Sequence, residues 1–185
     1  MAASASSGMT YRRTSRPSAS GAALTREVLE EVEGSATVSV SAPADEIWDL
    51  IADVRNTGKF SPEVIEAEWL DGAAGPALGA RFRGHVRRNE IGPVYWSTCR
   101  VTACEPGREF GFDVLVGGKP ANTWHYRLTP VDSGTEVTES FRMPDSAFTK
   151  IYSVLGGQLR RRRNIRDMRT TLERIKAVVE APEGT

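Results

Sequence analysis

Six short apolar or alternating runs follow one another through the middle of the chain, and they limit its fold more than any other feature. They cover residues 63–70, 79–88, 93–104, 108–117, 121–130 and 134–143. Turn-rich pieces separate them, such as Glu105-Pro106-Gly107 and Asp132-Ser133-Gly134. Short strands at regular spacing with short connections are typical of an antiparallel meander. An earlier alternating run, from about residue 35 to 41, predicts a seventh strand.

Helices are predicted on either side of this meander. Pro43, placed in a first helical turn with Asp45 and Glu46, opens a helix over about 44–54. The segment 56–62 is predicted to be a turn or a second short helix. One long amphipathic helix is predicted over 145–180, about 50 Å in length, because apolar residues recur there at three- and four-residue steps: Phe148, Ile151, Tyr152, Leu155, Leu159, Ile165, Met168, Leu172, Ile175 and Val179.

The order of these elements predicts an α+β fold. Its expected form is a seven-stranded curved antiparallel sheet wrapped around a long C-terminal helix, with two short helices after the first strand. The 185 residues suffice to bury a substantial core without disulfides or metals. We expect one domain over 35–181, a linker or short helical lead-in over 24–34 and a frayed end over 182–185. Residues 1–23, rich in Ser, Ala and Arg, are expected to be a disordered tail, with an organelle transit peptide as the alternative.

Charge and cysteine content exclude several classes of protein. The 24 basic and 24 acidic residues cancel, which argues against a globally basic nucleic-acid binder. No apolar run approaches the ~20 residues needed to span a bilayer, and the N-terminus lacks the apolar stretch of a secretory signal. Cys99 and Cys104 lie on one predicted strand, roughly 17 Å apart, too far for a disulfide. We therefore expect free thiols and a cytoplasmic location. We also expect a monomer or a homodimer.

Several short sequence segments are informative when their order along the chain is considered. They are Ser41–Trp48, the segment 53–62, Val101–Phe112, Trp124–Leu128, Gly134–Glu139, the Arg-rich opening of the last helix, and Leu172–Lys176. Together these segments resemble the START-like SRPBCC superfamily, particularly its polyketide cyclase/dehydrase-like branch, over about residues 35–181. One departure is Phe60, where such proteins often carry Trp.

This resemblance implies a helix-grip fold with a deep, mostly apolar cavity between the sheet and the last helix. Members of the superfamily bind lipids, sterols, quinones, polyketides or plant hormones, and a minority catalyse cyclisation or dehydration. Fold alone does not give function in such a family. No residue of a particular cyclase motif matches this chain, so the resemblance transfers no catalytic role.

Glu139 is the most informative polar residue of the predicted strands. It shares a strand face with Val137, Phe141 and Met143, where a carboxylate would be desolvated and its pKa raised. Such a group can act as a general acid or hold a ligand. The more ordinary alternative is a Glu paired with an Arg at the end of the sheet, or one turned to solvent by a bulge. Tyr126 needs a hydrogen-bond partner for its hydroxyl if it is buried, and it is the second catalytic candidate.

The expected ligand-binding residues lie on the apolar faces of the strands and on the last helix. Trp124 and Tyr126 alternate with polar residues, so they are either core or cavity wall. For the strand over 93–104 either face can point inward, the one with Cys99 or the one with Trp96. After Leu155, the pair Gly156-Gly157 is either a thin wall where a ligand enters or a helix break. The full expected set is Phe82, Phe112, Trp124, Tyr126, Glu139, Phe141, Phe148, Tyr152, Leu155 and Arg162.

The run Arg160–Arg163 invites a nucleic-acid or anionic-membrane interpretation. Its residues lie around most of the predicted helix, so we expect a salt-bridged, solvated flank and no nucleic-acid partner. Arg162 is the exception, because it follows the apolar stripe and can lie at the cavity rim. His85 and His125 have no partner at metal spacing, and no nucleophile elbow, phosphate loop or dinucleotide fingerprint occurs. We therefore expect neither a metal nor a cofactor.

Three functional hypotheses follow. The first is binding of a hydrophobic small molecule, such as a polyketide, lipid or quinone, with Tyr126, Glu139 or Arg162 holding its polar ends. The second is a metal-independent aromatase/cyclase or dehydratase that uses the same groups. The third is a co-chaperone or nucleic-acid-binding module that acts through the Arg-rich helix. The sequence does not identify the ligand or the pathway.

Overall fold

The computed structural model describes residues 34–87, 93–143 and 157–181, and for the last helix its side chains from residue 164 onward. The expected tail, the lead-in before Gly34 and the C-terminal residues 182–185 lie outside the described residues. The element order is strand, three short helical pieces, six strands and a final helix. The predicted α+β fold is confirmed.

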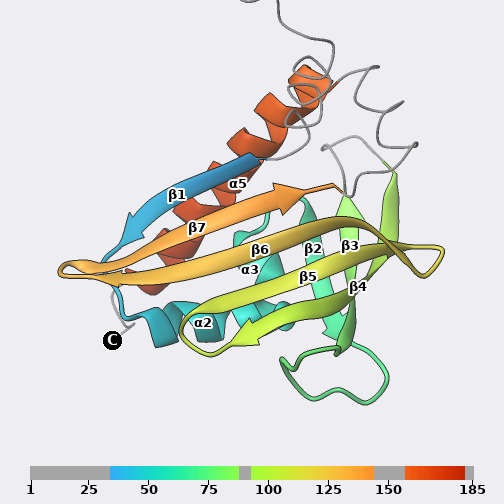
Figure 1. The fold of residues 1–185 in the computed structure, drawn as a ribbon, viewed down its shortest axis with the longest axis horizontal. Coiled ribbons are helices and arrows are strands. Elements are labelled where there is room, and N and C mark those ends of the chain that lie inside the picture. The colour runs from blue at the N-terminus through green and yellow to red at the C-terminus, as the bar shows by residue number, and fades with distance from the viewer. Residues whose placement is uncertain (1–33, 88–92, 144–156, 182–185) are drawn as a thin grey trace, which may run out of the picture.

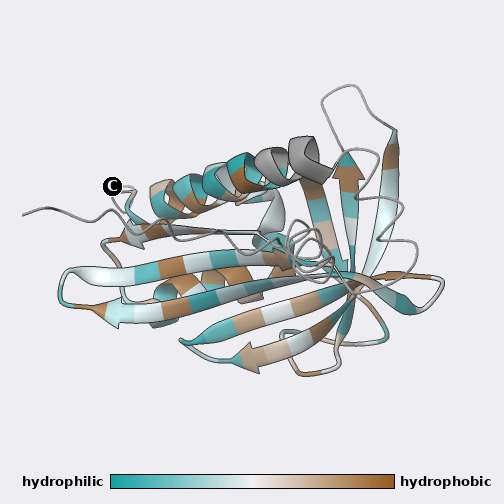
Figure 2. Ribbon diagram, turned by 45° about the horizontal axis from the view of Figure 1, so that its top comes forward, coloured by the Kyte–Doolittle hydropathy of each residue, from teal (hydrophilic) through white to brown (hydrophobic). Residues whose placement is uncertain are grey.

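Seven strands form one antiparallel sheet in the order β1-β7-β6-β5-β4-β3-β2 (Figure 1). Consecutive strands from β2 to β7 are neighbours, which is the predicted meander, and β1 closes the order beside β7. Figure 2 shows hydrophilic and hydrophobic residues alternating along most strands, as expected for a sheet with one covered face. The strands are β1 (Gly34–Val40), β2 (Val64–Trp69), β3 (Arg81–Arg87), β4 (Val94–Glu105), β5 (Glu109–Val116), β6 (Lys119–Val131) and β7 (Gly134–Arg142).

The β5–β6 turn is shorter than the sequence suggested. Lys119 and Pro120 belong to β6, paired with Val116 and Leu115, so the gap predicted between the runs 108–117 and 121–130 becomes the two-residue turn Gly117-Gly118. Both glycines have positive φ, 59° and 77°, as a two-residue hairpin turn that matches the strand twist requires. Pro120 stays in the strand because a register shift at Val114/Leu115 accommodates it.

The helices between β1 and β2 cover one end of the sheet. They are α2 (Ala44–Ala52), the 3₁₀ turn η1 (Val54–Asn56) and α3 (Thr57–Phe60), so the predicted helix and the second short helix are both present. Pro43 is the N-cap residue of α2, one position before the predicted first turn. Gly107, in the β4–β5 turn, has φ of 68°, and a Cβ there would lie 2.2 Å from Asp45 Oδ1. The positive φ favours glycine at position 107, and the missing Cβ leaves space for the Asp45 side chain at the start of α2.

Helix α5 (Gly157–Val179) carries the central part of the core. It packs against β1 and also contacts β7, α2 and α3, and in Figure 1 it runs across the β1 side of the sheet. Its most buried side chains are Met168, Leu172 and Ile175, which belong to the predicted apolar stripe. The described helix is about 34 Å long at 1.5 Å per residue, and residues 145–156 of the longer prediction lie outside the described part.

Candidate functional site

A cavity of about 150 Å³ lies between the sheet, the short helices and α5. Every strand from β2 to β7 contributes to its wall, and so do η1, α3 and α5. Most of the lining is apolar. Five of the ten expected ligand-binding residues line it: Phe82, Phe112, Trp124, Tyr126 and Glu139.

The aromatic part of this wall is built across neighbouring strands. Phe82 and Phe112 meet edge to face with ring centroids 5.1 Å apart, a favourable geometry for two aromatic rings. Trp124 packs against Phe141 at 4.8 Å. Phe141 is buried but is not among the lining residues, so it supports the Trp124 ring from behind. Phe148, Tyr152, Leu155 and the side chain of Arg162 lie outside the described residues.

The inward face of β4 is the one that carries Cys99. Ser97 and Cys99 line the cavity together with Tyr95, whereas Trp96 and Arg100 lie on the opposite face. Both cysteines are free, as predicted. Burial raises the pKa of the Cys99 thiol to about 12, so this thiol stays protonated and contributes to the wall as a small hydrophobe.

Tyr126 and Glu139 form a buried pair on the cavity wall. They face each other in the β6–β7 register, and Tyr126 Oη donates a 2.8 Å hydrogen bond to Glu139 Oε1. Glu139 is only 3% exposed, and its partner is a phenol. Neither the Arg pairing nor the solvent exposure of the ordinary alternative describes this residue.

Burial gives this pair an unusual electrostatic state. Loss of solvation raises the pKa of Glu139 to about 8, partly opposed by the hydrogen bond from Tyr126. The pKa of Tyr126 lies well above its usual value, through burial and through the neighbouring carboxyl group. At neutral pH the Glu139 side chain is therefore a carboxylic acid. Because Oε1 accepts the hydroxyl proton of Tyr126, the acid proton belongs on Oε2.

Among the residues that the structure describes, two oxygen atoms on this wall are buried without a hydrogen-bond partner. One is Glu139 Oε2 and the other is Oδ1 of Asn122. Asn122 precedes Trp124 by two residues on β6, so both side chains lie on the inner face. Asn122 was not among the residues predicted to bind a ligand, although the same period of two extends from Tyr126 through Trp124 to this position. A buried polar atom without a partner costs about 1–3 kcal/mol.

The described part of α5 adds polar residues that sequence reasoning also missed. Asp167 and Thr171 line the cavity beside the predicted Met168. Thr171 is buried and donates a hydrogen bond to the Asp167 carbonyl, 3.0 Å away, one turn earlier in the helix. No periodicity distinguishes these residues, because they flank the apolar stripe and do not form part of it.

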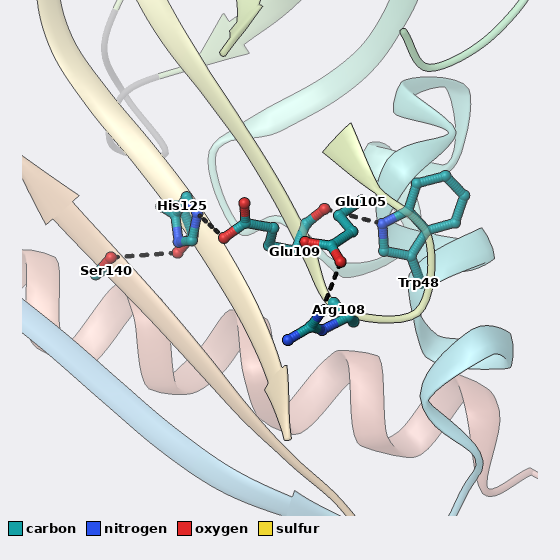
Figure 3. Close-up of polar contacts among 6 residues, drawn as sticks. All are labelled: Trp48, Glu105, Arg108, Glu109, His125 and Ser140. Atoms are coloured by element: carbon teal, nitrogen blue, oxygen red, sulfur yellow. Dashed lines mark hydrogen bonds and ion pairs between the residues drawn. The ribbon is translucent and has the colours of Figure 1, made fainter. Parts of the chain in front are cut away.

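The opposite face of the sheet carries a second polar cluster (Figure 3). Glu109 holds Nε2 of His125 at 3.2 Å, and its carbonyl accepts the indole N–H of Trp48. Ser140 Oγ donates to the main-chain carbonyl of His125, not to its ring. A Ser-His-Glu composition is present here, but the serine is not hydrogen-bonded to the imidazole, as a nucleophile would need to be. The cluster ties β5, β6, β7 and α2 together.

Several other charged residues are paired on the surface. His85 contacts Glu66 at 3.1 Å and stacks on Trp96, with ring centroids 4.5 Å apart. Within 34–87, 93–143 and the described side chains of α5, no three His, Cys, Asp or Glu residues gather in a way that could hold a metal ion. The side chains of Arg160–Arg163 lie outside the described residues. Further along α5, Arg174 donates to the carbonyl of Ser61 next to the cavity. None of the helices described here combines the length and apolar character of a transmembrane span.

Comparison with known proteins places this site in context. A polyketide cyclase-like protein of Corynebacterium glutamicum is 26% identical, with a TM-score of 0.58 over 80% of this chain and 91% of that chain. A Mycobacterium smegmatis protein is 22% identical, with a TM-score of 0.59 over 83% and 94%. The di-domain ARO/CYC of the steffimycin biosynthetic pathway is 17% identical, with a TM-score of 0.61 over 84% of this chain and 53% of its own.

The search of curated proteins found no match. The family described as polyketide cyclase/dehydrase and lipid transport matches residues 31–180, which is most of the 185-residue chain. The match covers all seven strands and α5. The chain therefore belongs to the polyketide cyclase/dehydrase and lipid transport family, within the SRPBCC-like fold.

Proposed function

We propose that this protein binds a hydrophobic small molecule, polyketide-, lipid- or quinone-like, in the cavity between the sheet and the C-terminal helix. The observation that carries this proposal is the buried Tyr126–Glu139 pair, whose second carboxyl oxygen has no partner in the described part of the chain. A ligand atom at that oxygen would remove the cost of the missing hydrogen bond. The family and its relatives support the same conclusion.

The size of the cavity defines what part of a ligand it holds. A cavity of about 150 Å³ with apolar walls has room for one benzene-sized ring. Tyr95 lines the cavity and is 42% exposed, so the cavity reaches the surface at the start of β4. A longer ligand would place one ring inside and continue outward past Tyr95. Apolar burial would supply most of its affinity, at roughly 25 cal/mol per Å².

A cavity-filling substitution tests this proposal. Gly84 lines the cavity, and a Cβ there would meet only Val64 Cγ1, at 3.5 Å. A Gly84→Leu side chain therefore has space to grow into the cavity. We expect native mass spectrometry of the full-length chain from its own host to show a bound small molecule that Gly84→Leu excludes. Arg83→Leu, the adjacent outward position, is the matched control and should retain the ligand. An unliganded native protein, or one whose ligand survives Gly84→Leu, would contradict the proposal.

A second candidate function is catalysis by the same pair, as an aromatase/cyclase or dehydratase. The observation in its favour is the pKa of Glu139, about 8, since a general acid works best with a pKa near the working pH. Glu139 would donate and accept protons while Tyr126 orients the substrate oxygen. Product formation from a poly-β-keto chain, lost in Glu139→Gln and Tyr126→Phe while binding persists, is the expected result. Tight binding without turnover would leave only the binding function.

A further inference from the structure

We propose that the cavity selects an uncharged ring that presents a hydrogen-bond acceptor to Glu139 at one end and a donor to Asn122 at the other. This inference rests on the proposed function, since it specifies what the same cavity accepts. It assigns Asn122 as a second binding residue.

The Glu139 end requires an acceptor because of how the pair is arranged. Tyr126 Oη already donates to Oε1 at 2.8 Å, so the carboxyl group has its remaining hydrogen-bonding capacity at Oε2. That atom is buried and has no hydrogen-bond partner within the described ranges, and Glu139 is 3% exposed. In the acid form Oε2 carries the proton and acts as a donor. A ketone, quinone or ether oxygen satisfies it without adding charge to the cavity.

The Asn122 end requires a donor. Its buried Oδ1 has no partner among the described residues, and the residue lines the same cavity. Asn122 and Tyr126 are four residues apart on the same face of β6, roughly 13 Å along an extended strand. This backbone separation leaves room between the two side chains for one six-membered ring that carries polar substituents at opposite positions. A hydroxyl group on the ligand is the matching donor.

The described groups that line the cavity disfavour an anionic ligand beside Glu139. The ionisable groups among its described lining residues are Glu63, Asp167, Glu139, Tyr95, Tyr126 and Cys99, and none of them is basic. On the other side of β7, β1 places Ala36 opposite Glu139. A ligand carboxylate beside Glu139 would therefore meet another acid, in a medium where charge is poorly screened.

Four para-substituted benzenes that do not change charge between pH 6 and 8 provide the test. The reference compound is 4-(hydroxymethyl)acetophenone. 4-Methylacetophenone lacks its hydroxyl group, whereas 4-(hydroxymethyl)benzoate and 4-(hydroxymethyl)benzylamine replace its ketone by an anionic and a cationic group. Binding to the full-length chain is measured by NMR titration at pH 7. We expect the hydroxymethyl ketone to bind at least tenfold more tightly than the benzoate. It should bind two- to tenfold more tightly than the methyl ketone, the range of one net hydrogen bond.

The pH profile identifies the acid form of Glu139 as the donor. With the two ketones, which do not ionise up to pH 10, wild-type affinity should be constant to about pH 8 and then fall about tenfold per pH unit. Cys99 and Tyr126 have pKa values too high to titrate in that range. In Glu139→Gln the amide oxygen can still accept from Tyr126 while its NH₂ donates to the ketone. That variant should keep the affinity and lose the pH dependence.

Asn122→Leu separates the second end from the first. This variant should bind the methyl ketone as well as the wild type does and lose the preference for hydroxymethyl. Equal or tighter binding of the benzoate or the benzylamine, a flat wild-type profile to pH 10, or an unchanged preference in Asn122→Leu would overturn the inference. Equal binding of all four probes would overturn it and leave the proposed function standing. If none of the four probes binds and the protein from its own host carries no ligand, both this inference and the proposed function are overturned.

Discussion

Two buried hydroxyl–carboxyl pairs lie on opposite faces of the same sheet, and they differ in one respect. On the inner face Tyr126 donates to Glu139, and on the outer face Thr123 donates to Asp113, each at 2.8 Å. Both carboxyl groups are nearly inaccessible, 3% and 8% exposed. Asp113 has its other oxygen held by Arg100 at 3.3 Å, whereas no described residue bonds to the other oxygen of Glu139.

The difference follows from what each face meets. Arg100, Asp113 and Thr123 are directly opposite one another across β4, β5 and β6, on a face where a long basic side chain reaches water. The inner face meets the cavity, and no basic residue is among its described lining. A buried acid whose two oxygens are both hydrogen-bonded within the protein is accounted for by a structural role. A buried acid with one oxygen open toward a cavity indicates a binding site.

The largest expected difference between the two pairs is in the pH dependence of stability. A Glu titrates near 4.5 when unfolded, whereas the folded protein holds its Glu139 proton until about pH 8. Between these values the folded state binds one more proton, so the free energy of unfolding falls by about 1.4 kcal/mol per pH unit. It should level off above about pH 8. Urea denaturation from pH 4.5 to 9 measures this slope.

Glu139→Gln is the variant that tests this slope, because its amide cannot ionise. We expect the part of the slope that comes from Glu139 to disappear, so that the variant is more stable than the wild type at pH 9. Asp113→Asn is the matched control on the outer face and should keep the wild-type slope. A Glu139→Gln protein with an unchanged slope would show that Glu139 is ionised in the folded state.

Replacing each acid by an apolar residue should separate the pairs by a smaller amount. Asp113→Leu leaves the Thr123 hydroxyl and the Arg100 guanidinium without their acceptor, which costs about 1–3 kcal/mol. Glu139→Leu leaves only the Tyr126 hydroxyl unpaired and removes a desolvated carboxyl group, so at pH 8 its stability should equal or exceed that of the wild type. Thermal unfolding of both variants at pH 8 provides the measurement. If Glu139→Leu lost more stability than Asp113→Leu, the Tyr126–Glu139 pair would be the one that stabilises the fold.

Most of the fold could be predicted because each element carries its own local signal. The alternation Val137, Glu139, Phe141 defined β7 and its inner face, and the stripe Met168, Leu172, Ile175 defined the buried side of α5. The β5–β6 turn was the exception. There Lys119 and Pro120 have turn-like composition, and only pairing with β5 shows that the strand already includes them.

The candidate site was less accessible to sequence reasoning. Period two placed Tyr126 and Glu139 on inner faces, but their contact depends on the β6–β7 register, which no single strand specifies. Asn122 was missed because a polar residue near a strand end is usually solvated. Its unpartnered oxygen becomes visible only when the cavity is formed. Asp167 lacks even a periodic signal.

Removing each hydroxyl donor should give similar losses of stability but different pH profiles. Tyr126→Phe and Thr123→Val each delete one hydrogen bond, worth about 0.5–1.5 kcal/mol at pH 6. The hydrogen bond from Tyr126 lowers the pKa of Glu139, so its loss should move the levelling-off of the stability curve to higher pH. Thr123→Val should leave the curve where it is. Identical profiles for the two variants would show that the Tyr126 hydrogen bond is not coupled to the proton on Glu139.

The smallest expected effect concerns Arg100, the residue that makes the outer pair complete. Its side chain is 45% exposed, so its ion pair with Asp113 is screened, and Arg100→Met should cost no more than about 1 kcal/mol. High salt should remove most of that cost, because screening weakens the wild-type pair as well. Denaturation at low and high NaCl measures it. A salt-independent loss well above this value would mean that Asp113 depends on its counter-ion as a deeply buried acid does. Glu139 has no counter-ion among the described side chains, and it would then be the more unusual of the two acids, because burial keeps it protonated.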